Sequence, residues 1–386
     1  MAITDIKAFS HLTEADVEEL GRELNQIRVE IEEERGDVDA AYIQRSIKIQ
    51  RTLAAAGRVT LFASMFPPAW VAGTTMLGLA KIIENMELGH NVIHGQWDWM
   101  NDPEIHSSTW EWDTTCPSDH WKHSHNFVHH KYTNVVGKDN DVGYGILRIT
   151  RDQKWHPINL GQPFYNAMLA MFFQYGVAMH DLDLEAIRKG EKDLNVARAQ
   201  LKQIGRKVAR QLGKDYVMFP LLTGPAFVST LTANATANLM RNLWSYTVIF
   251  CGHFPDGAEK FTVEEFENET KPEWYLRQML GSANFTAGPL MRFMSGNLCY
   301  QIEHHLFPDL PSNRYAEMSV KIQALCEKYE LPYTTGSLAH QYAQTLRTIW
   351  KLSLPNRFLR ATVDAAPETA SEKGGSVQQI RLGAAA

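Results

Sequence analysis

The sequence predicts an all-helical protein, partly inserted in a membrane as helical hairpins, with clusters of histidines near the helix ends. Uncharged stretches cover 59–80, 155–180 and 216–240, and each is long enough for roughly one bilayer crossing of about 20 residues. A helical repeat is clear near the N-terminus, and the histidines cluster at helical spacing. If these stretches form hairpins, about four helices would cross the membrane, since only helices or closed barrels satisfy the backbone in lipid.

The first helix is expected over residues 13–35. Thr13 is a good N-cap, with Asp16 three residues later. Apolar residues then recur at alternating steps of four and three, at Val17, Leu20, Leu24, Ile27 and Ile31. A single apolar stripe beside many glutamates indicates packing against the rest of the chain. A dimeric coiled coil is the less favoured alternative, because the stripe is short.

Charge around the apolar stretches favours hairpins over single crossings. Segment 187–214 has nine Lys/Arg and only two acids, so it should stay on the cytoplasmic side. Pro67 and Pro68 would then turn the chain between an arm at 52–66 and a returning arm at 69–90. This places the beginning and the end of the first hairpin on the same side of the membrane.

A second hairpin is expected to turn near 230–234, between arms at 216–231 and 235–252. The stretch 155–180 would lie as one helix in the membrane interface. Arg58 would have to lie near the surface or extend its guanidinium toward the headgroups. The alternative is that all three apolar stretches are buried core helices of a soluble protein.

Composition limits the partners and the compartment. The net charge of −6 argues against nucleic acid. The N-terminus is acidic and lacks the apolar core of a signal peptide. Four scattered cysteines indicate neither disulfides nor a thiolate metal site. We divide the chain into an N-terminal cytosolic helical region at 1–51, a membrane domain at 52–360 and a disordered tail at 361–386.

The first two histidine clusters suit metal binding. His90 and His94 are four residues apart, which places both rings on one face of a helix. His125 and His129 repeat this spacing, and His130 would point about 100° away toward a neighbouring ion. One such pair is a weak signal, whereas two of them near hydrophobic arms are more specific.

The third cluster is QIEHH, with His304 and His305 three and four residues after Gln301. His253 stands alone, directly after the last expected arm, and a lone histidine is more often structural than a ligand. Eight imidazoles are too many for one zinc ion, and this ligand type suits iron, copper, nickel or zinc. Two ions that share the set are the favoured hypothesis, and a run of histidines without metal is the alternative.

Other polar residues near the clusters have weaker assignments. Asp139, Asn140 and Asp141 follow the second cluster and are outer partners of the histidines or, as we prefer, a simple polar turn. His123 fits the helical spacing of its cluster poorly and is interpreted as a surface or outer group.

The motifs HNVIH, HNFVHH and QIEHH resemble the three histidine boxes of the membrane fatty acid desaturase family, in order and with its hydrophobic spacing. The resemblance is closer to one group within this family, the acyl-CoA desaturases of the mycobacterial type, which convert stearoyl-CoA to oleoyl-CoA. It is carried by stretches such as CGHFPDGAEKF and SGNLCYQIEHHLFPDLPSNRY. The resemblance covers roughly positions 1–360 and implies four membrane-crossing helices under a cytosolic catalytic cap.

The resemblance also implies a site with two non-haem iron ions that uses O2 on a long-chain acyl-CoA. The implied metal ligands and catalytic residues are His90, His94, His125, His129, His130, His253, His304 and His305. The third box begins with Gln301 where many acyl-CoA enzymes have histidine, so Gln301 and Asn297 are candidates for weak or water-mediated ligands. The site would face the cytoplasm from the cell membrane.

No dinucleotide-binding glycine motif is present, so electrons from NADPH would arrive through a separate flavin reductase. Candidate contacts to the CoA phosphates are Arg148, Arg151, Lys154, Arg188 and Lys189. A basic face that meets anionic lipid explains these five equally well.

Two other functions remain open. A membrane di-iron hydroxylase would use the same ligands and leave oxygen in the product. A non-catalytic membrane metal-binding protein would instead place ligands midway along its crossing helices.

Overall fold

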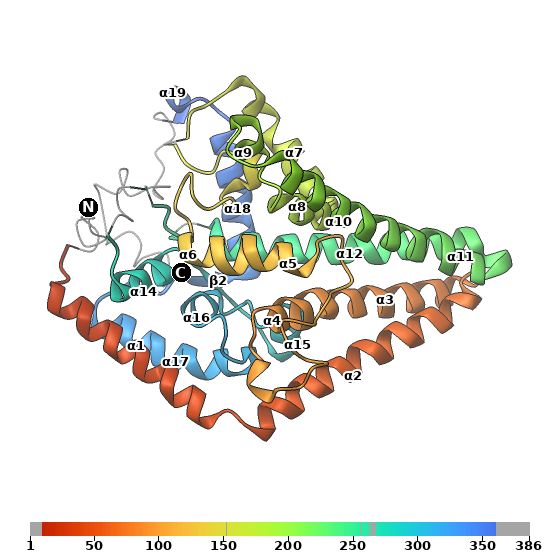
Figure 1. Ribbon diagram of the computed structural model, residues 1–386, viewed down its shortest axis with the longest axis horizontal. Coiled ribbons are helices and arrows are strands. Elements are labelled where there is room, and N and C mark those ends of the chain that lie inside the picture. Colours follow the sequence, from red (N-terminus) through yellow and green to blue (C-terminus); the bar gives the residue numbers. More distant parts are fainter. Residues whose placement is uncertain (1–9, 152, 256, 262, 264–267, 360–386) are drawn as a thin grey trace.

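The computed structural model describes residues 10–359, apart from 152, 256, 262 and 264–267. This part of the chain is almost entirely helical, which confirms the expected class (Figure 1). Its one sheet pairs β1 (Asn284–Thr286) with β2 (Thr335–Ser337) in parallel. The expected tail at 361–386 lies outside the described residues.

The first helix, α1 (Glu14–Glu34), confirms the predicted element. Thr13 and Asp16 form a capping box, in which each side chain bonds the backbone N–H of the other residue. The apolar stripe packs into a core shared with α14 (Lys271–Leu280) and α17 (Tyr315–Lys328). The stripe is therefore buried within its own chain, as the favoured interpretation required.

The first hairpin is formed by α2 (Asp37–Thr60) and α3 (Pro67–Ile83). The chain reverses over residues 61–66, so Pro67 and Pro68 begin α3 instead of forming the turn. Proline suits these positions because the first helical N–H groups have no partner within the helix. The domain boundary expected after residue 51 falls inside α2.

Two helices that carry histidine boxes contain π-helical turns. Helix α3 continues as a π-helical segment, Glu84–His90, and then as α4 (Asn91–Ile93). A second π-helical segment, Lys122–His129, joins α5 (Ser118–Trp121) to α6 (His130–Tyr132). Such segments are rare and occur frequently at functional sites.

The second hairpin differs from its prediction. Its first arm is α10 (Leu194–Leu212), which continues through a π-helical segment (Gly213–Met218) to α11 (Phe219–Leu222). The returning arm is the unbroken helix α12 (Phe227–His253). The turn expected at 230–234 is therefore wrong. The chain reverses just before α12, where Gly224 takes a positive φ and Pro225 follows it.

The two hairpins lie side by side and point the same way (Figure 1, right), with α12 packed along α3. Large apolar side chains are exposed at both tips, including Phe62, Phe66, Leu221 and Leu222. Among the described residues, no helix is both long and apolar enough to cross a membrane. The returning helices α3 and α12 run back from these tips toward the histidine boxes.

Arg58 does not extend toward headgroups as expected. Its guanidinium lies between the hairpins, 2.8 Å from the buried carboxylate of Asp215. Lys81 approaches the other oxygen of that carboxylate, also at 2.8 Å. The ion pairs therefore join both arms of the first hairpin to the second one.

Stretch 155–180 is not one helix. A 3-10 turn (Pro157–Gly161) leads into α7 (Gln162–Met171), and the chain breaks at Phe172 before α8 (Phe173–His180). Both helices pack on α12 and bury Leu169, Ala170 and Phe173 there.

The remaining helices of the described chain are α9 (Leu184–Lys189), α15 (Pro289–Met294), α16 (Gln301–Leu306), α18 (Leu338–Leu352) and α19 (Asn356–Leu359). Its remaining 3-10 turns are Leu61–Ala63, Asp98–Met100, Gly143–Gly145, Gly224–Ala226 and Ser312–Arg314.

Candidate metal centre

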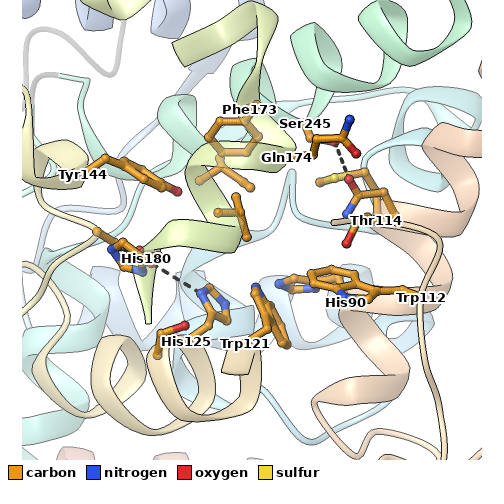
Figure 2. A pocket seen from close by; sticks show the side chains of 16 residues that line it. His90, Trp112, Thr114, Trp121, His125, Tyr144, Phe173, Gln174, His180 and Ser245 are labelled. Carbon is orange, nitrogen blue, oxygen red and sulfur yellow. Dashed lines mark hydrogen bonds and ion pairs between the residues drawn. The ribbon is translucent and has the colours of Figure 1, made fainter. Parts of the chain in front are cut away.

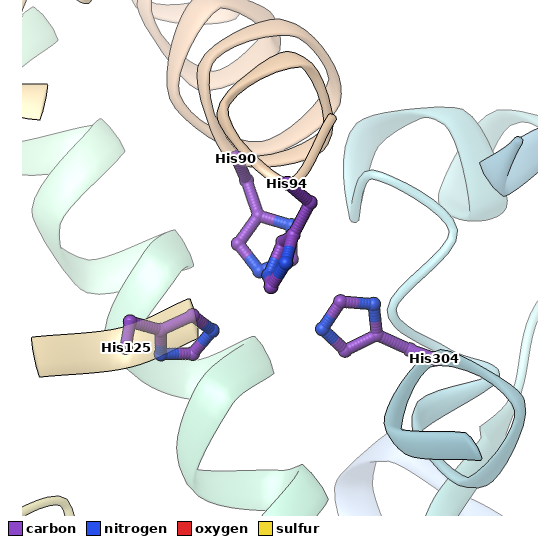
Figure 3. A group of neighbouring side chains, drawn as sticks. All are labelled: His90, His94, His125 and His304. Atoms are coloured by element: carbon purple, nitrogen blue, oxygen red, sulfur yellow. The ribbon is translucent and has the colours of Figure 1, made fainter. Parts of the chain in front are cut away.

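Four histidines from three parts of the chain form the first group (Figure 3). His90 and His94 come from the end of the α3–α4 helix. His125 comes from the π-helical segment Lys122–His129, and His304 comes from α16. The figure shows their rings pointing toward one another. One nitrogen of each lies within 4.8 Å of the corresponding atom of the others, which is close enough for one shared ion.

The second group contains His129, His253 and His305, whose ligand atoms also lie within 4.8 Å of one another. His253 is the last residue of α12, so the returning arm of the second hairpin delivers it to the site. The structure thus places the lone histidine beside two box histidines, as a ligand role requires.

His130 lies between the two groups. Its ring centre is 4.7 Å from that of His94 in the first group and 4.5 Å from that of His305 in the second. The preceding helix is π-helical, so the expected α-helical angle of about 100° does not apply there. All eight candidate histidines therefore converge on one region.

The arrangement of ring nitrogens fits metal ions. Outward-facing Nδ1 atoms have partners: the Tyr315 hydroxyl for His304 at 3.1 Å and the Gln278 amide oxygen for His305 at 3.0 Å. The buried ring nitrogens of the eight that have no hydrogen-bond partner are Nε2 of His94, His125, His129, His304 and His305, both nitrogens of His130, and Nδ1 of His253. So many buried ring nitrogens without a partner are unusual in a folded protein, and metal ions would satisfy the acceptors among them.

The charge state of the rings also suits metal ligation. Burial, helped by neighbouring imidazoles, lowers the pKa of His304 and His305 well below the usual range, so both rings are neutral at neutral pH. Burial alone would also lower the pKa of His129, but Asp139 and Asp141 raise it to about 9. These carboxylates favour a positive charge at this ring, and a bound cation supplies one.

Asp139 and Asp141 contact the outer nitrogens of candidate ligands, so the preferred interpretation of a simple polar turn is incomplete. The segment does form a turn, and Asn140 is exposed on it. Asp139 accepts a hydrogen bond from Nδ1 of His129 at 2.9 Å. Asp141 approaches Nδ1 of His125 at 3.4 Å and Nδ1 of His129 at 3.3 Å. Carboxylates in this position fix the orientation of a ligating imidazole.

Sequence reasoning missed His180, the last residue of α8. Its Nε2 lies 3.1 Å from Oδ1 of Asp141, the carboxylate oxygen that does not approach His125 and His129. Burial raises the pKa of Asp141, yet the neighbouring histidines, His180 first, shift it below the usual range. The signal in the sequence was the same as for His253, a single histidine at the end of an apolar stretch.

The two weaker ligand candidates differ. The Gln301 amide lies 3.1 Å from Nε2 of His253, inside the second group, and its oxygen has no partner. The Asn297 amide instead donates to Tyr42 and Glu87. His123, interpreted as a surface or outer group, is exposed and contacts Asp181.

The five residues expected to contact the CoA phosphates do not form one exposed basic cluster. Arg148 is buried and donates to the backbone oxygens of Gln153, Leu352 and Leu354. It therefore holds the C-terminal segment. Lys154, Arg188 and Lys189 are exposed, and Arg151 is partly exposed.

An aromatic pocket adjoins the first group (Figure 2). Trp121 stacks on His125, with ring centres 4.3 Å apart. Trp112, Tyr144 and Phe173 line the other walls, together with His90 and His180. The pocket therefore lies directly beside the candidate metal ligands His90 and His125.

Residues 66–337, which include the buried histidine centre and the residues that line the adjoining pocket, match the fatty acid desaturase family. The chain belongs to that family. It is 59% identical over 377 residues to proteins named NADPH-dependent stearoyl-CoA 9-desaturase from two strains of Mycobacterium tuberculosis. That match covers 97% of this chain and 88% of each relative.

More distant relatives share the family. An sn-1 linoleoyl-lipid 6-desaturase from Synechocystis is 25% identical over 281 residues, 71% of this chain and 77% of that protein. A Delta(8)-fatty-acid desaturase from Euglena gracilis is 25% identical over 338 residues, 83% of this chain and 76% of that protein.

Proposed function

We propose that this protein is an acyl-CoA desaturase that introduces a cis double bond into a saturated long-chain acyl group, converting stearoyl-CoA to oleoyl-CoA. The observation that carries the proposal is the convergence of eight histidines, seven in two groups and His130 between them, beside an aromatic pocket. The 59% identity to NADPH-dependent stearoyl-CoA 9-desaturases supports this substrate and the position of the double bond.

The reaction balances with one O2, two electrons and two protons per double bond, and it yields two waters. Ordinary side chains cannot break the C–H bond of an unactivated methylene. A bound pair of iron ions would supply this chemistry with O2. We assign one ion to His90, His94, His125 and His304 and the other to His129, His253 and His305. His130 stands between them, and Gln301 is a further ligand candidate of the second ion.

The protein's own contribution is to hold one carbon pair of the acyl chain beside the metals. Trp112, Trp121 and Phe173 form apolar walls that bind methylenes and exclude water. Asp139 and Asp141 orient His129 and His125 through their outer nitrogens. Exposed cations such as Arg188 and Lys154 remain candidates for the CoA phosphates.

We further propose that the two hairpins enter the cell membrane as a multi-pass anchor, with the metal centre facing the cytoplasm. The apolar side chains at both hairpin tips support this orientation, because such patches mark contact with lipid or protein. Electrons would come from NADPH through a separate flavin reductase.

The test is expression with a competent reductase in a host that lacks the activity, followed by fatty acid profiling. The wild type should convert stearate to oleate. His304→Ala should abolish conversion, while the exposed His340→Ala should retain it. A wild-type profile that stays saturated would contradict the proposal. Mass analysis separates the hydroxylase alternative, since desaturation removes two hydrogens and hydroxylation adds an oxygen.

A further inference from the structure

Trp274 connects the surface to the metal centre. Its side chain is partly exposed on α14, and its indole N–H donates to the backbone oxygen of His130 at 3.3 Å. His130 is the ring between the two histidine groups. One hydrogen bond and one residue therefore separate a surface indole from the middle of the candidate site.

The surface around Trp274 is aromatic and basic. Phe127 is 57% exposed, although His125 and His129 on the same π-helical segment point inward. The exposed Lys131 lies over the Phe127 ring at 5.6 Å, and the exposed Lys271 lies over the Trp274 ring at 3.4 Å. We call Phe127, Lys131, Lys271 and Trp274 the docking face.

These residues belong to one continuous surface because α14 packs on the chain that follows the second box. Arg277 on α14 donates to the backbone oxygens of Lys131 and Thr133. The described acids of this region are engaged internally: Glu269 pairs with the buried Arg277, and Glu273 caps α14 at Thr270. Asp309, which interacts with Lys271, is likewise paired with Arg28. Among the described residues, Lys131 and Lys271 therefore give the docking face its positive charge.

The docking face also lies away from the proposed membrane anchor. Figure 1 shows α6 and α14 at the end of the molecule opposite the hairpin tips. A water-soluble protein can therefore reach this face while the hairpins are in lipid.

We propose that the docking face receives the electron donor, a flavoprotein reductase with an acidic contact surface, and that Trp274 positions the electron path to His130. The inference rests on the proposed function, which requires two electrons per double bond. The reduced flavin gives up two electrons and one proton, and desaturation with O2 consumes the two electrons. NADPH then re-reduces the oxidised flavin by hydride transfer, with formation of NADP+. Electron transfer weakens steeply with distance, and one hydrogen bond joins Trp274 on this face to the backbone of a candidate ligand. Opposite charges would speed the encounter of the two proteins.

The experiment uses iron-loaded protein in lipid nanodiscs with stearoyl-CoA and O2. Electrons come either from dithionite, which reduces the protein without oxygen before O2 is admitted for a single turnover, or from NADPH through a purified flavoprotein reductase. The reductase is chosen because it reduces the iron of the wild type. Lys131→Glu/Lys271→Glu is compared with the control Lys48→Glu/Lys202→Glu, which makes the same charge change at exposed positions on α2 and α10. Binding of the reductase to each variant is measured directly as well.

The docking-face variant should require roughly tenfold more reductase for half-maximal rate, because complementary charges accelerate association by at least this factor. Its dithionite-driven turnover should equal that of the wild type. Trp274→Phe keeps a ring and loses the N–H donor, so it should slow reductase-driven reduction at saturating reductase with unchanged iron content. Added salt should weaken only the reductase-driven reaction.

Equal reductase dependence and equal reductase binding for the two double variants would overturn the docking face. Failure of the proposed function appears differently: the wild type would form no product with dithionite. The binding comparison would still decide whether the reductase uses this face.

Discussion

Nδ1 of His129 and Oδ2 of Asp139 lie 2.9 Å apart, and both side chains are buried. The same carboxylate oxygen accepts the backbone N–H of Asn134 at 2.8 Å. Asp139 thereby fixes the ring of a candidate ligand to the turn that follows the second histidine box. This contact leads to a direct test of the metal centre.

Replacing Asp139 with Asn should weaken iron binding by about 10- to 100-fold, as expected when an outer partner of a ligating histidine is lost. The substitution keeps the shape of the side chain but removes its charge. Iron per protein after dialysis against a graded chelator series measures the effect. Asp119→Asn, at a side chain that is 84% exposed, is the control and should bind iron as the wild type does. Identical iron retention in both variants would contradict the assigned role.

Gly252→Ala should disturb the second histidine group without changing any ligand. A Cβ at this position would lie 2.8 Å from Cδ of Gln301, which in turn contacts His253. Because that distance is too short, Gln301 must move, and we expect loss of iron from this group together with most of the activity. Spectroscopic iron quantitation and product analysis measure the two effects.

The matched control is Gly205→Ala on α10, where a Cβ would meet no atom within 4 Å. This change should keep activity and raise stability by up to about 1 kcal/mol, because alanine favours helix. Full iron occupancy in Gly252→Ala would show that Gln301 does not constrain the group.

Asp215→Asn should destabilise the paired hairpins by about 3–5 kcal/mol, the usual cost of leaving buried charges without a partner. Arg58 and Lys81 both contact this carboxylate at 2.8 Å, and Asn234 donates to the backbone oxygen of Asp215 at 2.7 Å. Thermal unfolding in detergent compares the variant with Glu33→Gln, an exposed position on α1. An unchanged midpoint in both would mean that the ion pairs do not hold the hairpins together.

Removal of iron should lower thermal stability, because ligands that bind only the folded state stabilise it by mass action. At a free Fe(II) concentration of 100 times Kd the gain is about 2.7 kcal/mol per site. Unfolding of chelated protein should therefore shift upward when Fe(II) is added back. His304→Ala should show a smaller shift, since the first group loses a ligand. The idea fails if the wild type and His304→Ala respond equally to added iron.

Local sequence patterns predicted those features that depend on neighbouring residues alone. The capping box of α1 and its buried stripe follow from the spacing of Thr13, Asp16 and the apolar residues. The box histidines were recognised because two rings on one helix face need a spacing of four. His253 became a ligand candidate only through the family resemblance, because a lone histidine has no spacing of its own.

The predictions that failed concerned contacts between segments distant in sequence. The second turn was misplaced because charge placed the basic stretch 187–214 on the cytoplasmic side, before the hairpin. The structure instead uses its residues in α10, the first arm of the hairpin. Arg58 was expected near headgroups because its partner Asp215 is 157 residues away in the chain. His180 was overlooked for the same reason, since only folding brings α8 to Asp141.

The sequence by itself determined the helical class, the family and the eight imidazoles available for metal, because periodicity and motif spacing are local properties. Only the tertiary structure decided how those rings divide into two groups, which carboxylates orient them and which surface reaches them. Such arrangements arise when packing brings remote segments together, and no local pattern encodes the distance between α12 and the second box.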